Sequence, residues 1–180
     1  WIARRDPDAT MIVLPADHLI ENKAEFQRVL SNASQAAENS GNLVTVGIKP
    51  TWPCPSYGYV ERGRKASIGG VDDQPVWEVA RFREKPNPDL AEHFIAQGNF
   101  LWNAGMFIWT IPAIFSELSR HCPVLADFVS ELRGSKDFMA TVAKQFGKLP
   151  KLSIDYALME KATRVLNIEA TFDWDDVGNW

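Results

Sequence analysis

Short apolar runs alternate with amphipathic stretches in the first part of the chain. Residues 11–16 and 43–48 are continuous apolar runs with the length of strands that are covered on both faces. Between them, apolar residues recur on one face of a helix, at Phe26, Val29, Leu30, Ala33 and Ala37. Gly41 follows where a left-handed C-cap is expected. The order strand, helix, strand predicts one crossover unit of a parallel sheet.

A proline-rich segment then interrupts this alternation. Residues 49–70 contain three prolines followed by Tyr57-Gly58-Tyr59, which is typical of a loop that enters a strand, as in a hairpin. The remaining pattern predicts, in order, a strand at 76–84, a helix at 89–97 ended by Gly98, a strand at 105–110, a helix from 111, at least two helices within 124–147, a helix capped by Ser153 and a strand at 164–170.

These elements predict an α/β fold with a mostly parallel sheet and flanking helices. With 180 residues, of which 46% are hydrophobic, the chain can bury one core, so we expect a single domain over residues 1–180. The chain begins with Trp1 and not with Met. We therefore expect it to be a piece of a longer protein.

Composition excludes several classes of function. The net charge is −4 and no run of basic residues occurs, which argues against a nucleic-acid partner. No apolar run reaches the roughly 18 residues of a membrane span, so we expect no membrane partner. The two cysteines, Cys54 and Cys122, lie far apart in different contexts, which favours a reducing compartment over a disulfide framework. A cytoplasmic location is the expectation.

Polar side chains, most of them titratable, stand next to several of the expected strands. They are Asp17 and His18, Glu84 and Lys85, Asn103, and Asp175 and Asp176. In open α/β sheets ligands bind outside the carboxyl ends of the strands, so these side chains could converge on one crevice.

Each of these residues also has a structural interpretation. Asp17 could cap the following helix, and His18 could be a packing group. Glu84 and Lys85 could form a solvated pair worth under about 1 kcal/mol. Asn103 could bind backbone in a turn, and the two late aspartates could cap or turn as well.

Five strings strengthen the functional interpretation because they occur together in a fixed order. LPADH, GIKPTWPCPSYGYV, RFREKPNPDLAEHFIAQGNFLWNAGMFIW, LSIDYALMEK and FDWDDVGNW resemble the sugar-phosphate nucleotidyltransferases, from about Met11 onward. The resemblance is greatest to those that make GDP-mannose and pyrophosphate from GTP and mannose 1-phosphate. It implies the Rossmann-like fold of nucleotide-diphospho-sugar transferases, here incomplete at both ends, and allows a homodimer.

The resemblance also implies roles for individual residues. Asp17 and Asp176 would be catalytic carboxylates that hold Mg²⁺, which takes one or two protein carboxylates together with phosphate oxygens and waters. Lys85 would be the third catalytic residue and would meet the sugar phosphate as a point charge. The substrate-binding residues would be Gly58, Glu84, Asn103 and Asp155.

The chain departs from the family pattern in three places. Pro55 and Ser56 stand where threonine and glycine are common before YGY, and Ala104 replaces a serine. The glycine-rich loop that cradles the triphosphate, with its arginine and lysine, is absent from these residues. We therefore expect this chain alone to be a weak catalyst or none, with exposed strand edges that favour association.

Three alternatives stay open from the residues. The enzyme could use another sugar or base, or the chain could be a non-catalytic regulatory relative that binds a nucleotide sugar. It could also be a metal-dependent hydrolase that uses His18 and the aspartates. The other histidines are His93 and His121, both in helical contexts, which disfavours the hydrolase.

Overall fold

The main sheet of the computed structural model, which describes residues 1–71 and 74–179, has six strands. Their order is β1–β6–β3–β7–β5–β4, with an additional pairing of β6 with β4. The strands are β1 (Thr10–Val13), β3 (Leu43–Ile48), β4 (Gly58–Ala66), β5 (Val76–Arg83), β6 (Phe100–Thr110) and β7 (Val165–Glu169). A second, two-stranded sheet pairs β2 (His18–Leu19) with β8 (Asp175–Asp176).

The expectation of a mostly parallel sheet is wrong. Within the described residues, β3 and β7 form the one parallel pair, and the other paired strands are antiparallel. β1 and β3 do run in the same direction, because each is antiparallel to β6, but β6 lies between them. The hydrophobic pattern indicated the strands of the main sheet but not β2 or β8, and it carries no information about a later strand that inserts between two earlier ones.

Five strands close into a small barrel. Pairing runs from β4 to β5, β7, β3 and β6, and β6 pairs back to β4. Closure leaves few backbone groups of these strands unpaired. The predicted hairpin is confirmed, because β4 and β5 are antiparallel neighbours. Val44, Val46, Tyr59 and Ile168, each fully buried, are part of the core.

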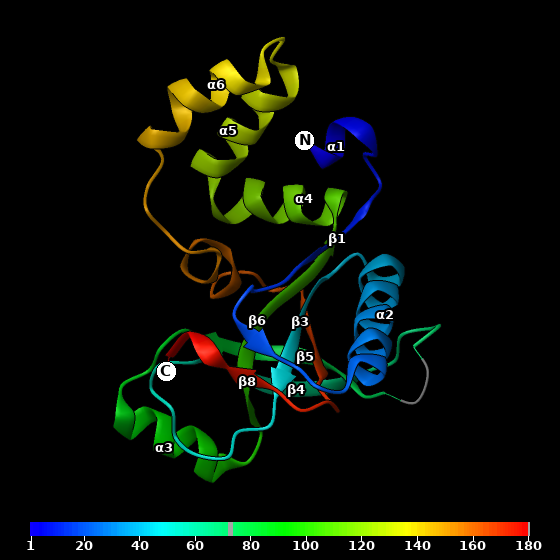
Figure 1. Cartoon of the computed structure of the whole chain (residues 1–180), viewed down its shortest axis with the longest axis vertical. Helices are drawn as coiled ribbons and strands as arrows, with labels where there is room; N and C mark the ends of the chain where they lie inside the picture. Colours follow the sequence, from blue (N-terminus) through cyan, green and yellow to red (C-terminus); the bar gives the residue numbers. More distant parts are fainter. Residues whose placement is uncertain (72–73, 180) are drawn as a thin grey trace.

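Helices cover the sheet and extend from it (Figure 1). They are α1 (Ile2–Arg5), α2 (Lys23–Ser40), α3 (Pro88–Gln97), α4 (Ile111–His121), α5 (Pro123–Gly134) and α6 (Phe138–Gln145), with short turns η1 (Phe146–Lys148), η2 (Asp155–Met159) and η3 (Val177–Asn179). The predicted C-caps are confirmed, since Gly41 and Gly98 have φ of 64° and 72°. In the part of the chain that is described, no helix has the length and apolarity needed to cross a membrane.

Three local predictions need correction. β1 is not covered on both faces: it is paired with β6 alone, and Ile12 and Val13 are 44% and 38% exposed. The strand predicted at 105–110 begins at Phe100, because β6 continues through Gly105 at a positive φ of 66°. The helix predicted after Ser153 is one π-helical turn, η2, and Ser153 contributes its carbonyl oxygen to the N–H of Ala157.

Candidate active site

Two of the predicted acids lie together at the β2–β8 ladder. His18 pairs with Asp176 in this ladder, and the N–H of Val177 donates to the carbonyl oxygen of Asp17 at 3.0 Å. As a result, one potential ligand atom from each of Asp17, His18 and Asp176 lies within 4.8 Å of the others. Residues from the two ends of the chain therefore form one cluster, which we call the acid cluster.

Gly178 makes the close approach of the two carboxylates possible. A Cβ at this position would overlap Asp17 Oδ2 and would lie 3.1 Å from Asp176 Oδ1. The Gly178 N–H donates to the same Asp176 oxygen at 3.0 Å, which orients the carboxylate. Gly178 was not predicted as a site residue, although its place in the string DVGNW was the available signal. Trp180, the last residue of that string, lies outside the described residues.

His18 supports the acid cluster as a hydrogen-bonding and packing group. Trp174 Nε1–H donates to His18 Nδ1 at 3.0 Å, and the two rings meet edge to face at 5.1 Å. Burial lowers the pKa of His18, while the charges of Asp176 and Asp17 oppose this shift. Since Nδ1 accepts a hydrogen bond, the neutral ring carries its proton on Nε2 and offers no free lone pair to a cation. Two carboxylates then remain as ligands, a donor set that fits Mg²⁺.

The four predicted substrate-binding residues form a second cluster, which we call the amide cluster. Gly58 on β4 lies opposite Asn103 on β6, and Asn103 Nδ2 donates to Asp155 Oδ1 at 3.2 Å. Asn103 Oδ1 accepts from the Thr45 hydroxyl at 2.9 Å, so its amide orientation is fixed from both ends. A Cβ at Gly58 would overlap Glu84 Oε2, which brings the fourth residue into the same cluster.

Glu84 is an acid of the amide cluster with a raised pKa. Its side chain is 10% exposed, and burial, together with the nearby charge of Asp155, raises its pKa to about 7. Lys85 Nζ lies 3.7 Å from Glu84 Oε1 and opposes the rise, whereas Glu160 adds to it. Glu160 also accepts the Glu84 N–H at 2.9 Å, a contact that the sequence did not indicate. Lys85 is 62% exposed and has a positive φ of 45°, an uncommon conformation for a residue with a side chain.

Tyr57 and Trp174 connect the two clusters. The Tyr57 ring lies 5.1 Å from the Trp102 ring and 5.4 Å from the Trp174 ring. Burial raises the pKa of Tyr57 to about 12, and the Asp176 charge contributes to this shift. Tyr57 precedes Gly58 of the amide cluster, and Trp174 binds His18 of the acid cluster. The polar residues therefore form two clusters that these rings link, and their convergence on one crevice stays a prediction.

The structural interpretations of Asp17 as a helix cap and of Asn103 as a turn residue are wrong. Asp17 does not cap the following helix, because Asn22 is the N-cap of α2 and accepts the Glu25 N–H at 3.2 Å. Asn103 lies in a strand and not in a turn, although its Oδ1 also accepts the Gly105 N–H at 3.2 Å. His93 and His121 lie on α3 and α4, and neither belongs to the metal-competent group found among the described residues. The hydrolase alternative therefore lacks a second histidine.

A separate apolar cavity of about 420 Å³ lies between α1, α4 and α5, with Met11, Ile111 and Phe115 among its lining residues. It contains no residue of either cluster. The volume of a cavity therefore does not identify the candidate site in this chain, whereas the convergence of polar groups does.

Comparison with known proteins identifies the family. The sequence profile described as "Nucleotidyl transferase" matches residues 1–180. The chain belongs to the nucleotidyl transferase family. It is 40% identical over 177 residues to a mannose-1-phosphate guanylyltransferase of Sinorhizobium fredii, with 96% of this chain and 33% of that protein covered. It is 35% identical over 179 residues to the Escherichia coli K12 protein of the same name, with 97% and 37% covered.

A solved structure supports the same family assignment. The fold is similar, with a TM-score of 0.85 and 32% identity, to a Thermus thermophilus protein described as a mannose-1-phosphate geranyltransferase. The match covers 99% of this chain and 49% of that one. The chain thus spans about a third of the length of the curated nucleotidyl transferases it matches.

Proposed function

We propose that the protein containing this chain makes GDP-mannose and pyrophosphate from GTP and mannose 1-phosphate, with Mg²⁺ as cofactor. The names of the relatives at 35% and 40% identity support the substrates. The observation that carries the proposal is the meeting of Asp17 and Asp176, with ligand atoms within 4.8 Å, from opposite ends of the chain.

The acid cluster would hold the metal through Asp17 and Asp176. Bound Mg²⁺ would supply positive charge to the triphosphate oxygens where charge develops during transfer. Gly178 keeps the space between the two carboxylates open, and its N–H fixes one of them. The Trp174 hydrogen bond holds the His18 ring, whose proton is then on Nε2.

The amide cluster would bind the hexose and its phosphate. Asn103 and Asp155 bind each other and present donors and acceptors suited to sugar hydroxyls. Glu84, with a pKa of about 7, can both accept and donate near neutral pH. The exposed, positively charged ammonium of Lys85 would bind the negatively charged phosphate of mannose 1-phosphate.

Pyrophosphate release tests the proposal directly. The full reading frame that encodes this chain should release pyrophosphate when GTP and mannose 1-phosphate are both supplied with Mg²⁺, and little with UTP, dTTP or glucose 1-phosphate. Residues 1–180 alone should release much less, since they lack a glycine-rich loop to position the triphosphate.

The alternatives give different results in this assay. Faster release with another sugar or base would replace the proposed substrates within the same family. Nucleotide-sugar binding without turnover by the full protein would identify a regulatory relative. Equal rates for the full protein and residues 1–180 would show that the reaction does not require a glycine-rich loop. A homodimer and a cytoplasmic location stay predictions.

A further inference from the structure

We propose that Asp173 is a positioning residue that sets the distance between Asp17 and Asp176 by binding the backbone just before α2. The inference rests on the proposed metal site and extends it to a residue outside both clusters. Asp173 binds the backbone N–H groups of Glu21 and Asn22, so its effect on the acids would be exerted through the backbone.

The side chain of Asp173 joins two distant segments of the chain. Its Oδ2 accepts the Glu21 N–H at 2.7 Å, and its Oδ1 accepts the Asn22 N–H at 3.1 Å. These two bonds hold the pKa of Asp173 below its ordinary value. Both oxygens of one carboxylate are thereby committed to adjacent backbone donors.

Each of the joined segments carries one of the acids. Asp17 lies shortly before Glu21, and Asp176 lies shortly after Asp173. Asp176 belongs to β8 and Asp17 directly precedes β2, and these two strands form a ladder of only two residue pairs. An isolated pair of strands is marginally stable even when it is longer. The ladder therefore needs a further attachment to keep its spacing, and the Asp173 bonds provide one next to it.

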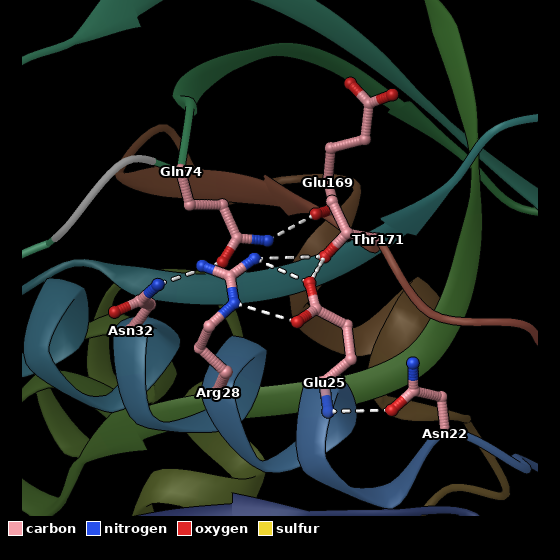
Figure 2. Close-up of polar contacts among 7 residues, drawn as sticks. All are labelled: Asn22, Glu25, Arg28, Asn32, Gln74, Glu169 and Thr171. Atoms are coloured by element: carbon pink, nitrogen blue, oxygen red, sulfur yellow. Dashed lines mark hydrogen bonds and ion pairs between the residues drawn. The ribbon is translucent and has the colours of Figure 1, made fainter.

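Helix α2 provides the rigid reference for this attachment. Its residues Val29 and Ala33 are fully buried in the core. Figure 2 shows how its first turns bind the segment after β7: Arg28 donates to the Thr171 hydroxyl at 3.2 Å and to Glu25 Oε1 at 2.6 Å, and Thr171 itself donates to Glu25. The segment that leads to Asp176 is thus bound to α2 at Thr171 and to the backbone just before α2 at Asp173.

A second contact fixes the beginning of the same segment. Gln74 Nε2 donates to the Glu169 carbonyl oxygen at 2.6 Å, and Asn32 on α2 donates to Gln74 Oε1 at 3.0 Å (Figure 2). Glu169 is therefore held to α2 through Gln74, Thr171 directly, and Asp173 to the residues just before the helix. Asp173 is the last of the three before the acid, so its loss should disturb Asp176 most directly.

The geometry suits a carboxylate. Each of the two N–H groups binds a different oxygen of Asp173, whereas an asparagine would place an NH₂ group, itself a donor, opposite one of them. Asp173→Asn should keep one hydrogen bond and Asp173→Ala should keep none, so the two variants should have graded effects. Substitution of groups that orient metal ligands typically weakens metal binding by about 10- to 100-fold.

Mn²⁺ binding to the full protein without substrates tests the role. Electron paramagnetic resonance should show an increase in the dissociation constant of about 10-fold or more for Asp173→Ala, with Asp173→Asn between it and the unsubstituted protein. Amide hydrogen exchange at Glu21 and Asn22 should become faster in the same order. A substitution that only lowered the stability of the fold would not produce this graded change in Mn²⁺ affinity.

Asp137→Ala is the matched control. Asp137 Oδ1 accepts the Ala140 N–H at 3.0 Å at the start of α6, so its loss also removes an aspartate bond to backbone, but away from the acid cluster. This variant should lose some thermal stability and retain its Mn²⁺ affinity. An equal loss of affinity in Asp137→Ala, or unchanged affinity in Asp173→Ala, would overturn the positioning role.

Product formation is measured on the same samples. If the unsubstituted protein makes no GDP-mannose but shows the graded loss of Mn²⁺ affinity, the proposed substrates are rejected and the positioning role is supported. If it makes GDP-mannose and Asp173→Ala binds Mn²⁺ normally, the positioning role alone is rejected.

Discussion

Replacement of Glu84 by glutamine should stabilise the fold while it impairs binding of the sugar phosphate. Glu84 is almost buried, and the charges of Asp155 and Glu160 are close enough to disfavour its ionised form. A charged carboxylate at this position is therefore tolerated at a cost to stability. Glutamine has nearly the same shape and no charge, so Glu84→Gln removes that cost.

The pKa shift gives the magnitude and the sign of the effect. The pKa of Glu84 rises from 4.5 to about 7 on folding, and one pKa unit corresponds to about 1.4 kcal/mol, so the ionised group destabilises the folded chain by about 3 kcal/mol above pH 7. This cost is absent well below pH 4.5, where the carboxyl is protonated in both states, and it grows as pH rises toward 7. Because the glutamine amide needs new partners, we expect Glu84→Gln to gain about 1–3 kcal/mol at pH 8.

Urea unfolding at two pH values measures this effect. The gain from Glu84→Gln should be fully present at pH 8 and should fall below about 0.5 kcal/mol at pH 4.5. Glu92→Gln, an exposed position on α3, is the control and should change the unfolding free energy by less than about 0.5 kcal/mol at both pH values. In the full protein, the same Glu84 variant should raise KM for mannose 1-phosphate more than KM for GTP.

Two results would refute this reasoning. If Glu84→Gln is no more stable than the original chain at pH 8, the carboxylate is not held at a cost. If the gain is the same at pH 4.5 and pH 8, it arises from packing and not from charge.

Three further substitutions test the acid cluster and the barrel. Asp176→Asn in the full protein should reduce Mg²⁺-dependent turnover to near background while circular dichroism stays unchanged; substantial residual rate would remove Asp176 from the metal site. Gly178→Ala places a Cβ against Asp17 and should raise the Mg²⁺ concentration needed for half-maximal rate by about 10- to 100-fold, and an unchanged Mg²⁺ requirement would contradict this role. Gly47→Ala brings a Cβ to 2.6 Å from Leu101, so barrel side chains must move. The free energy of unfolding in urea should fall by about 1–3 kcal/mol. An unchanged free energy of unfolding would show that these side chains move without cost.

Local signals in the sequence predicted most of the elements. The apolar face of α2 and the glycines at positions 41 and 98 gave the helix ends correctly, because these features depend on residues next to one another in the chain. The strand order was not predictable in this way. β6 pairs with β1, β3 and β4, and none of these contacts leaves a local mark in the sequence of β6.

The site was predictable to different degrees. Asp17, Glu84 and Asp176 were noticed from the pattern because each lies near the end of an expected strand. Their assignment to a metal and a sugar came from the family resemblance alone. Gly178 and Asp173 were missed because their importance depends on the chain that folds against them, which is Asp17 in one case and the backbone before α2 in the other.

The two clusters have different structural supports, and this difference has a functional consequence. Asn103 of the amide cluster lies opposite Gly47 on β3 and Gly58 on β4, so barrel closure positions it. The acid cluster depends on a two-residue ladder and on side-chain bonds to the start of α2. A substitution that loosens the barrel should therefore affect the sugar phosphate first, whereas one at the start of α2 should affect the metal first. The rings of Tyr57 and Trp174 contact each other between the two clusters. Removal of either ring should therefore change both the Mg²⁺ requirement and KM for mannose 1-phosphate.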